Sequence, residues 1–311
     1  MDPRFTNDHP IDARPLIASR GLRALVVSAA IIFPLAFCLL LKPASAHAAW
    51  VQFSRLLKLK MDPAGSAGKA PDISDARLKP LPPQQQAEIL LQAAIDRTPR
   101  AAEQIVGRAG SWRGHLARTA QLSGLLNTAL NSADMKVRAA AVESELAANN
   151  LGKNSRDAQS LIARIELDPA ARGWGLWMLG ALGNRGVESE RALGILTTFT
   201  HDPNEKTRYW AVEGLSLLGS DESVQPMLEV LHGDSSAEVR ERAACGLAQS
   251  GMLTKQQRMT AVPALVEYAN DTSLDASTRT LVYHALRDIT GADINDDASA
   301  WRNYWNETVS R

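Results

Sequence analysis

The sequence has little cysteine, few aromatic residues and no excess of charge of either sign. Its 311 residues include two cysteines, and Cys38 lies in an apolar run near the N-terminus, so the remainder holds a single thiol, Cys245, and cannot form an internal disulfide. Lysine plus arginine and aspartate plus glutamate both total 34, which argues against the basic surface that binding to nucleic acid requires. An aromatic content of 5% beside 45% hydrophobic residues is typical of an aliphatic helical protein rather than of a β-sandwich.

Motifs that carry catalysis or bind metal ions are missing as well. The sequence has no Gly-rich phosphate-binding loop, no G-x-S-x-G nucleophile elbow, no H-E-x-x-H zinc motif and no closely spaced pair of cysteines. Residues 293–297 resemble the first half of a calcium-binding loop, but Ala298 replaces the required glycine and Tyr304 replaces the closing glutamate. We therefore expect no catalytic residues, no metal site and no cofactor.

An uncharged apolar run occupies residues 24–41, with Arg20 and Arg23 before it and Lys42 after it. The run is as long as the roughly 18 apolar residues that can span a bilayer, but it contains a proline and is followed by small residues that signal peptidase accepts. Residues 1–49 are therefore predicted to be a cleaved signal peptide, with a retained signal anchor as the alternative. The flanking charges are too similar to decide between the two. Either outcome predicts an exported chain, and removal of residues 1–49 leaves 29 basic against 31 acidic residues.

Residues 50–86 are predicted to connect this segment to the folded part. Residues 50–60, W-V-Q-F-S-R-L-L-K-L-K, can place their large apolar side chains on one helical face beside basic residues. Such a helix rests on a membrane surface or packs against the first repeat, and the sequence does not distinguish the two. Residues 61–86 are rich in proline, glycine and alanine without periodicity, which predicts a flexible linker. The folded domain is expected to span residues 87–311.

Within that domain, five segments align without a gap over nine residues. They read V-R-A-A-A-V-E-S-E, A-R-G-W-G-L-W-M-L, T-R-Y-W-A-V-E-G-L, V-R-E-R-A-A-C-G-L and T-R-T-L-V-Y-H-A-L. Each opens with a small or β-branched residue followed by an arginine, and successive arginines are 34, 36, 32 and 39 residues apart. A period of this length indicates repeated structural units. The shared arginines are Arg138, Arg172, Arg208, Arg240 and Arg279.

The five segments also share flanking residues. An aspartate precedes each opening pair and suits a helix N-terminus, and in four segments a glycine follows the arginine where a helix C-cap is expected. Before the aspartate lies a second amphipathic run, such as residues 122–130, whose apolar residues recur three or four apart. Each unit is therefore predicted to be a helix, a short turn and a second helix. The aspartates are Asp134, Asp168, Asp202, Asp234 and Asp275, and the glycines are Gly183, Gly219, Gly251 and Gly291.

Stacking of such units predicts an all-α fold, an α-solenoid of two-helix repeats. One helix pair cannot bury its apolar face alone, but stacked pairs bury it against their neighbours. Residues 87–117 lack the arginine and are predicted to form an N-terminal cap, while residues 290–306, with their tryptophans and tyrosine, are predicted to form a C-terminal cap. Over residues 120–291 the pattern of aspartate, arginine and glycine resembles the HEAT-repeat family, including its bacterial phycobilisome-lyase-like members of the armadillo type.

The resemblance implies a fold used mostly by adaptors and scaffolds, with a few enzymes among them. Enzymes of this class that carry a di-iron centre, such as deoxyhypusine hydroxylase, use His-Glu pairs, and this sequence has no His-Glu dipeptide. Bilin lyases lack a compact motif, and an exported N-terminus does not suit their role in the cytosol. The resemblance also implies a bacterial source. The chain is then expected in the periplasm or cell envelope, or attached to the inner membrane by residues 24–41.

Two sets of repeated residues are candidates for contact with a partner. The five arginines could offer cations to an acidic partner, but an arginine in such repeats commonly pairs with an aspartate of the adjacent turn, so a structural role is favoured. Trp174 and Trp210 occupy the same repeat position, and Trp177 lies one turn beyond Trp174. If they are partly exposed, these tryptophans form a partner-binding surface, whereas burial at the edge of the core is the favoured alternative.

These features predict a non-catalytic protein-binding scaffold or adaptor of the cell envelope. One alternative is a lyase-like or other enzyme on the same solenoid, which requires a deep pocket with convergent titratable groups. Another is a structural domain tethered to a membrane. The partner is expected to be an unidentified protein rather than a nucleic acid, with membrane contact through the N-terminal segment if that segment is not cleaved.

Overall fold

The computed structural model describes residues 72–309, and the regular structure within this range is entirely helical. This confirms the all-α prediction. Residues 1–71, which contain the predicted signal or anchor segment, residues 50–60 and the first part of the predicted flexible linker, lie outside the described residues. None of the helices in residues 72–309 is both long enough and apolar enough to cross a bilayer.

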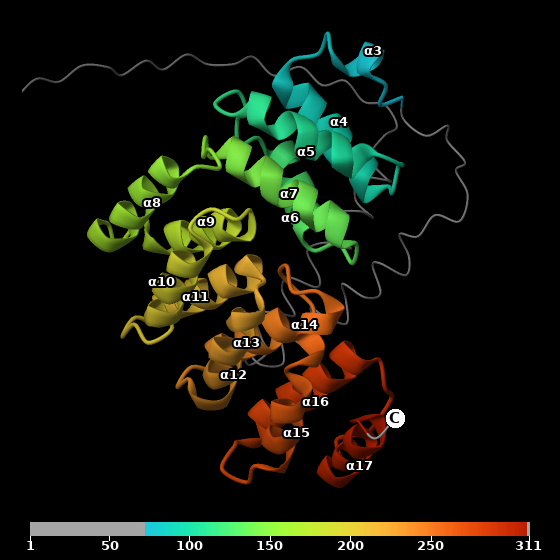
Figure 1. Ribbon diagram of the computed structural model, residues 1–311, viewed down its shortest axis with the longest axis vertical. Helices are drawn as coiled ribbons and strands as arrows, with labels where there is room; N and C mark the ends of the chain where they lie inside the picture. Colours follow the sequence, from blue (N-terminus) through green and yellow to red (C-terminus); the bar gives the residue numbers. More distant parts are fainter. Residues whose placement is uncertain (1–71, 310–311) are drawn as a thin grey trace, which may run out of the picture. The chain divides into compact units, whose positions relative to one another are not determined.

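The helices follow one another along the chain as Figure 1 shows. They are α3 (Asp75–Leu78), α4 (Pro83–Ile95), α5 (Ala101–Trp112), α6 (Ala120–Leu130), α7 (Met135–Ala148), α8 (Ser155–Leu167), α9 (Arg172–Asn184), α10 (Ser189–Phe199), α11 (Glu205–Leu218), the 3-10 helix η1 (Asp221–Ser223), α12 (Val224–Gly233), α13 (Ala237–Ala248), α14 (Lys255–Met259), α15 (Val262–Asn270), α16 (Ala276–Thr290) and α17 (Ala298–Val309). Proline within these helices is confined to the first turn, at Pro83, Pro226 and Pro263, where no intrahelical N–H is required.

Each predicted repeat is a pair of packed helices. The pairs are α6 with α7, α8 with α9, α10 with α11, α12 with α13, and α15 with α16. The second helices carry the shared arginine in or near their first turn, and α9, α11, α13 and α16 pack on one another in chain order. At the C-terminal end α17 packs on α15 and buries Trp301. Because each pair from α8 onward meets mainly the next, this part of the structure has the predicted arrangement of stacked two-helix repeats.

The helical unit begins earlier in the chain than the sequence analysis places it. Helix α3 and the start of α4 lie within residues 72–86, which the sequence pattern assigns to the linker. Leu78 is fully buried and belongs to the same apolar cluster as Leu90 and Leu91 of α4. The prolines in this stretch hide the helical periodicity, but Pro83 stands at the first helical position, where a proline is well tolerated.

The helix C-termini differ in part from the prediction. Gly219 and Gly291 are C-caps in the left-handed conformation, with φ of 60° and 76°. Gly183 instead lies inside α9, because Gly186, with φ of 80°, supplies the left-handed turn three residues later. Gly251 also has a positive φ, of 73°, but it lies in the loop beyond the end of α13.

The repeated aspartates lie in the turns that precede the second helices. Two of the five, Asp134 and Asp275, are the N-caps of those helices. In the other three repeats the aspartate lies ahead of the cap and accepts a hydrogen bond from the amide two residues later. These acceptors are Asp168 at 3.0 Å, Asp202 at 2.8 Å and Asp234 at 2.8 Å. An aspartate in such a turn replaces a backbone acceptor and fixes the entry into the helix.

Helices α9 and α11 approach closely enough for their backbones to touch. A Cβ atom on Gly180 would lie 2.1 Å from the carbonyl oxygen of Gly214, and one on Gly214 would lie 2.7 Å from the carbonyl oxygen of Leu176. Both glycines are buried. Any side chain at these two positions would push the helices apart, so the crossing requires glycine.

Helix α7 lies between two clusters of buried apolar side chains. Its Val137 and Ala141 pack with α3 to α6, whereas Val142 and Leu146 belong to the larger cluster that continues to α17. Buried polar residues of α7 accompany these apolar ones. The boundary between the two clusters therefore contains charged groups, and the candidate site lies there.

Candidate binding groove

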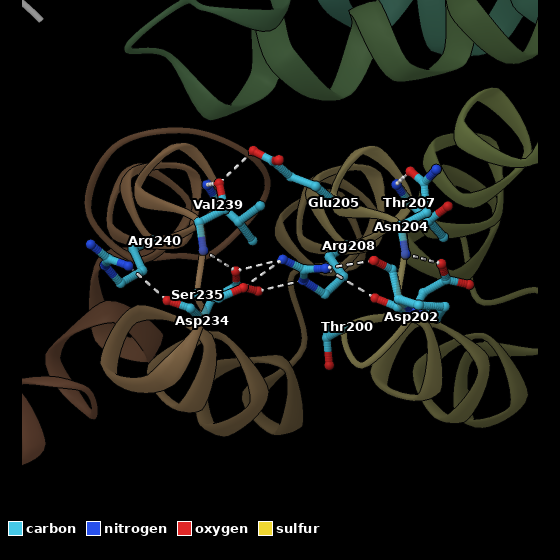
Figure 2. Close-up of polar contacts among 12 residues, drawn as sticks. Thr200, Asp202, Asn204, Glu205, Thr207, Arg208, Asp234, Ser235, Val239 and Arg240 are labelled. Atoms are coloured by element: carbon cyan, nitrogen blue, oxygen red, sulfur yellow. Dashed lines mark hydrogen bonds and ion pairs between the residues drawn. The ribbon is translucent and has the colours of Figure 1, made fainter.

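Arg208 shows how a shared arginine joins neighbouring repeats (Figure 2). Its Nε and Nη2 atoms donate to the two carboxylate oxygens of Asp234 in the next repeat, at 2.8 and 2.9 Å, and its Nη1 donates to the Asp202 carbonyl of its own turn at 3.1 Å. The hydrogen bond to Asp234 raises the pKa of Arg208 above its ordinary value. A bidentate pair of this kind fixes the relative geometry of two repeats.

The same connection recurs on both sides of Arg208. The onward pairs are Arg172 with Asp202 at 3.7 Å, Arg208 with Asp234 at 2.8 Å, and Arg240 with Asp275 at 3.0 Å. Arg279, in the last repeat, donates to the Leu274 carbonyl of its own turn at 2.5 Å. These four arginines therefore brace turns within the stack.

Arg138 departs from this pattern. Its Nη1 donates to the carbonyl oxygens of Gln249 at 2.9 Å and Gly251 at 2.7 Å, in the loop after α13 and more than 100 residues further along the chain. Helix α7 packs mainly on α5 and α6 rather than on α9, so Arg138 is not placed beside the turn of the next repeat. The residue is 7% exposed, and burial lowers its pKa. Arg138 thus ties α7 to a distant loop.

A half-open groove of 820 Å³ has its walls on α6 and α7, on the first half of α9, along α11 from Lys206 to Leu217, and on Arg242 of α13 and the loop that follows that helix. Its volume falls in the range of roughly 300–1,000 Å³ typical of ligand-binding pockets. Arg138 and its acceptor residue Gly251 both line the groove. The contact between them therefore helps to set the separation of the walls.

The three candidate tryptophans meet in this groove. Trp174 and Trp177 of α9 and Trp210 of α11 all belong to its lining. Trp174 and Trp177 are half-buried and pack against the apolar core, and the Trp174 Nε1 donates to the Asn149 side chain at 3.2 Å. Trp210 is 38% exposed and covers Gly173, whose Cβ position would lie 2.5 Å from the indole. Trp210 therefore presents accessible aromatic surface to the groove.

The groove carries more positive than negative charge. Its lining includes the cations Arg118, Arg138, Arg172, Lys206 and Arg242 and the carboxylates Glu145 and Glu213. Arg118 forms an ion pair with Glu145, and the Arg242 Nη1 lies 3.4 Å from Glu213. Glu145 is 4% exposed, and burial raises its pKa while Arg118 opposes that shift. Both carboxylates of the groove are thus engaged by arginines.

Another buried carboxylate of α7 fixes the position of α9. Glu143 lies 3.0 Å from the Lys153 Nζ and 3.6 Å from the Arg185 Nε, at the C-terminal end of α9. Burial lowers the pKa of Arg185, and the charge of Glu143 opposes the shift. A buried charge without a partner is strongly destabilising, so Glu143 and Arg185 hold α7 against α9 behind the groove.

The described residues show no cluster of metal-ligating side chains and one free thiol. Within residues 72–309, no group of three or more histidine, cysteine or carboxylate side chains lies close enough to hold a metal ion. Burial raises the pKa of the Cys245 thiol, which disfavours the reactive thiolate. Aromatic packing and ion pairing are the contacts that the groove provides.

The sequence pattern identified the tryptophans of the groove and the repeat arginines Arg138 and Arg172, but not Arg118, Lys206 and Arg242. Trp174 and Trp210 each stand two residues after the shared arginine of their repeat. Arg242 has the same position relative to Arg240. The repeat register could therefore have identified Arg242. Arg118 precedes the first repeat and Lys206 lies before its arginine, so neither carries such a signal.

Comparison with known proteins agrees with this architecture. No curated protein is similar enough in sequence to be matched to this chain. Residues 158–248, which run from α8 to the end of α13, match the family model for HEAT repeats. Helix pairs of the same kind flank the matched range, as α6 with α7 and α15 with α16. The chain therefore contains HEAT repeats over residues 158–248.

Proposed function

We propose that the protein is a non-catalytic scaffold that binds a partner protein in the groove. HEAT repeats generally serve protein–protein interaction, and the surfaces of stacked repeats suit that use. The observation that carries the proposal is the gathering of Trp174, Trp177 and Trp210 from two repeats in one half-open groove. Tryptophan and arginine are the residues most enriched among interface hot spots, and both line this groove.

The form of the groove supports binding over catalysis. An enzyme on this fold needs titratable groups that converge on one reacting atom. Here the two carboxylates, Glu145 and Glu213, are each engaged by an arginine. The groove is half-open rather than enclosed, which suits a segment of another chain more than a small substrate held away from water.

The proposal includes a location in a bacterial cell envelope. The support is the apolar run at residues 24–41 and the small residues that follow it. Sequencing the N-terminus of the mature chain tests this: a start at His47 or Ala49 indicates cleavage and release, and an intact chain in the membrane fraction indicates an anchor. An intact chain in the cytosol would contradict the assignment.

Site-specific photocrosslinking in the full chain tests the binding function. A photoreactive residue, p-benzoylphenylalanine, placed at position 210 should yield a discrete crosslinked protein. The matched position is 106, because Val106 is another exposed large apolar residue, 43% exposed, on α5 and outside the groove. The same adducts from both positions, or none from position 210 in a folded chain, would contradict the proposal.

Truncation of the same side chains supplies the energetic test. Trp210→Ala should weaken retention of the crosslinked partner by about 30-fold, since truncation of a hot-spot tryptophan costs about 2 kcal/mol or more. Val106→Ala removes exposed apolar surface from another place and should leave retention unchanged. Circular dichroism of both variants shows whether the fold is intact. Equal retention by both folded variants would remove the groove from the interface.

A further inference from the structure

We infer that the partner segment that enters the groove is acidic, an inference that rests on the scaffold function proposed above. The whole chain has 34 basic and 34 acidic residues, so it has no general preference for an acidic partner. The groove lining, in contrast, contains five cations and two carboxylates. Positive charge is thus concentrated on the surface where the aromatic residues gather.

Arg118 and Arg242 pair with the carboxylates of the groove and Arg172 with Asp202 outside its lining, whereas Lys206 and Arg138 form no ion pair within residues 72–309. Lys206 is exposed in the first turn of α11, and no ion pair to it occurs among residues 72–309. Arg138 donates through Nη1 to two carbonyl oxygens, which leaves its charge in place, and its buried Nε has no hydrogen-bond partner among the described residues. The carboxylate that acts on it is that of Asp134, one helical turn away at an exposed N-cap.

A further buried cation stands behind the groove wall. Arg258 donates to the carbonyl oxygens of residues 246, 247, 250 and 253, so it also holds its charge without a carboxylate. Burial, together with repulsion by Arg138, lowers the pKa of Arg258 to about 10. With this pKa Arg258 remains charged at neutral pH, and it donates to the Ser250 carbonyl while Arg138 donates to the carbonyls of the flanking residues 249 and 251. A poorly hydrated pair of like charges raises the positive potential at this wall.

Helix α11 brings a cationic and an aromatic residue of the groove together. Lys206 and Trp210 are four residues apart on α11 and so lie on one face of that helix. An occupant that satisfies both must carry carboxylates beside apolar side chains. Interfaces of this composition use the apolar contacts for affinity and the complementary charges for orientation and selection.

Residues 50–60 of this chain do not have this chemistry. They contain Arg55, Lys58 and Lys60 and no acidic residue, so they would meet like charge in the groove. Like charges brought together at an interface are unfavourable. This argues against residues 50–60 as the occupant, and we assign the groove to an acidic segment of another protein.

Fluorescence anisotropy with the full chain and two labelled peptides tests the inference. One peptide contains Glu, Asp, Leu and Phe, and its matched partner carries Gln and Asn in place of every acid. The acidic peptide should bind more tightly, and its affinity should fall as salt is added. Lys206→Glu should weaken its binding by about fivefold, because an exposed charge pair is replaced by repulsion.

Lys255→Glu is the matched control, since Lys255 is likewise an exposed lysine in the first turn of a helix, α14, but lies outside the groove. It should leave binding of the acidic peptide unchanged. Equal affinity for the two peptides, equal weakening by the two variants, or no binding of either peptide would overturn the inference. Binding of an oligothymidylate that depends on Lys206, without binding of the acidic peptide, would overturn it as well.

The outcomes separate this inference from the scaffold function. If the acidic preference fails while position 210 still crosslinks a partner, the groove binds a protein of other composition and the scaffold function stands. If position 210 crosslinks nothing while the acidic peptide binds through Lys206, the groove recognises acidic segments but the proposed cellular scaffold fails.

Discussion

Replacing Arg138 with methionine removes the two hydrogen bonds that tie α7 to the loop after α13 and keeps most of the aliphatic volume. A hydrogen bond from a charged group contributes about 1.5–3 kcal/mol, so two such bonds contribute about 3–6 kcal/mol before desolvation is counted. Burial of the Arg138 charge opposes this, as its lowered pKa shows, and so does its repulsion of Arg258. We expect a net loss of about 2 kcal/mol in the contact between α7 and the loop.

Hydrogen exchange measures this loss locally. The two apolar clusters each keep their own core, so the contact between them should open without global unfolding. The Met252 amide, which donates to the Ser216 carbonyl at 2.8 Å, reports on the loop. A loss of about 2 kcal/mol corresponds to roughly 30-fold faster exchange at Met252 in Arg138→Met. Arg208→Met is the control, because it should accelerate exchange near Asp234 and leave Met252 unchanged.

Unchanged exchange at Met252 in a folded Arg138→Met chain would refute the reasoning, because the two hydrogen bonds would then contribute nothing to the position of the loop. Equal acceleration of exchange at Met252 in the Arg208→Met control would also refute the reasoning, on another ground. It would mean that the whole stack loosens whenever an arginine is lost, and that Arg138 has no separate role.

Two further predictions concern packing and acid stability. Gly180→Ala should lower the free energy of unfolding by about 1–3 kcal/mol in chemical denaturation, because the added Cβ meets the Gly214 backbone. Gly194→Ala is the control, since no atom lies within 4 Å of the added Cβ, and it should raise the free energy of unfolding by up to about 1 kcal/mol. The side-chain hydrogen bond with Ser273 is the largest cause that lowers the pKa of Asp271 from 3.8 to about 2. Because the pKa of Asp271 is lower in the folded state than in the unfolded state, its stabilisation of the fold is present above about pH 4 and is lost as the pH falls toward 2. Asp271→Asn should abolish that part of the dependence of unfolding free energy on pH. An unchanged pH dependence in this variant would contradict the assignment.

The helix pairs could be predicted because each repeat places the same types of residue at the same positions of its two helices. The shared arginine marks the first turn of a buried helix, and small residues such as Gly180 and Gly214 mark where helices cross. The N-terminal boundary could not be predicted in this way. Helix α3 and the start of α4 contain no repeat signature, and their place in the fold depends on Leu78 reaching a core formed by later helices.

The aromatic part of the candidate site was predictable from the sequence, and the repeat register also marks Arg242. Trp174 and Trp210 share a repeat position, so their proximity follows from stacking. The charged part depends on how α7 meets the repeats that follow. Arg138 has the same local sequence context as the other repeat arginines, yet its acceptors lie 111 and 113 residues away. No local pattern specifies such a contact, because it arises from the departure of α7 from regular stacking.

The bond from Arg138 to the loop after α13 has a consequence for the evolution of the chain. Solenoids ordinarily gain or lose whole units with little penalty, since each unit meets mainly its neighbours. Here the hydrogen bonds join α7 to the loop after α13, so every unit from α8 to α13 lies between the two joined parts of the chain. Duplication or deletion of one of these units would move the carbonyls of Gln249 and Gly251 out of reach of Arg138. The number of units between α7 and this loop is therefore fixed, while the number of units after the loop is free to vary.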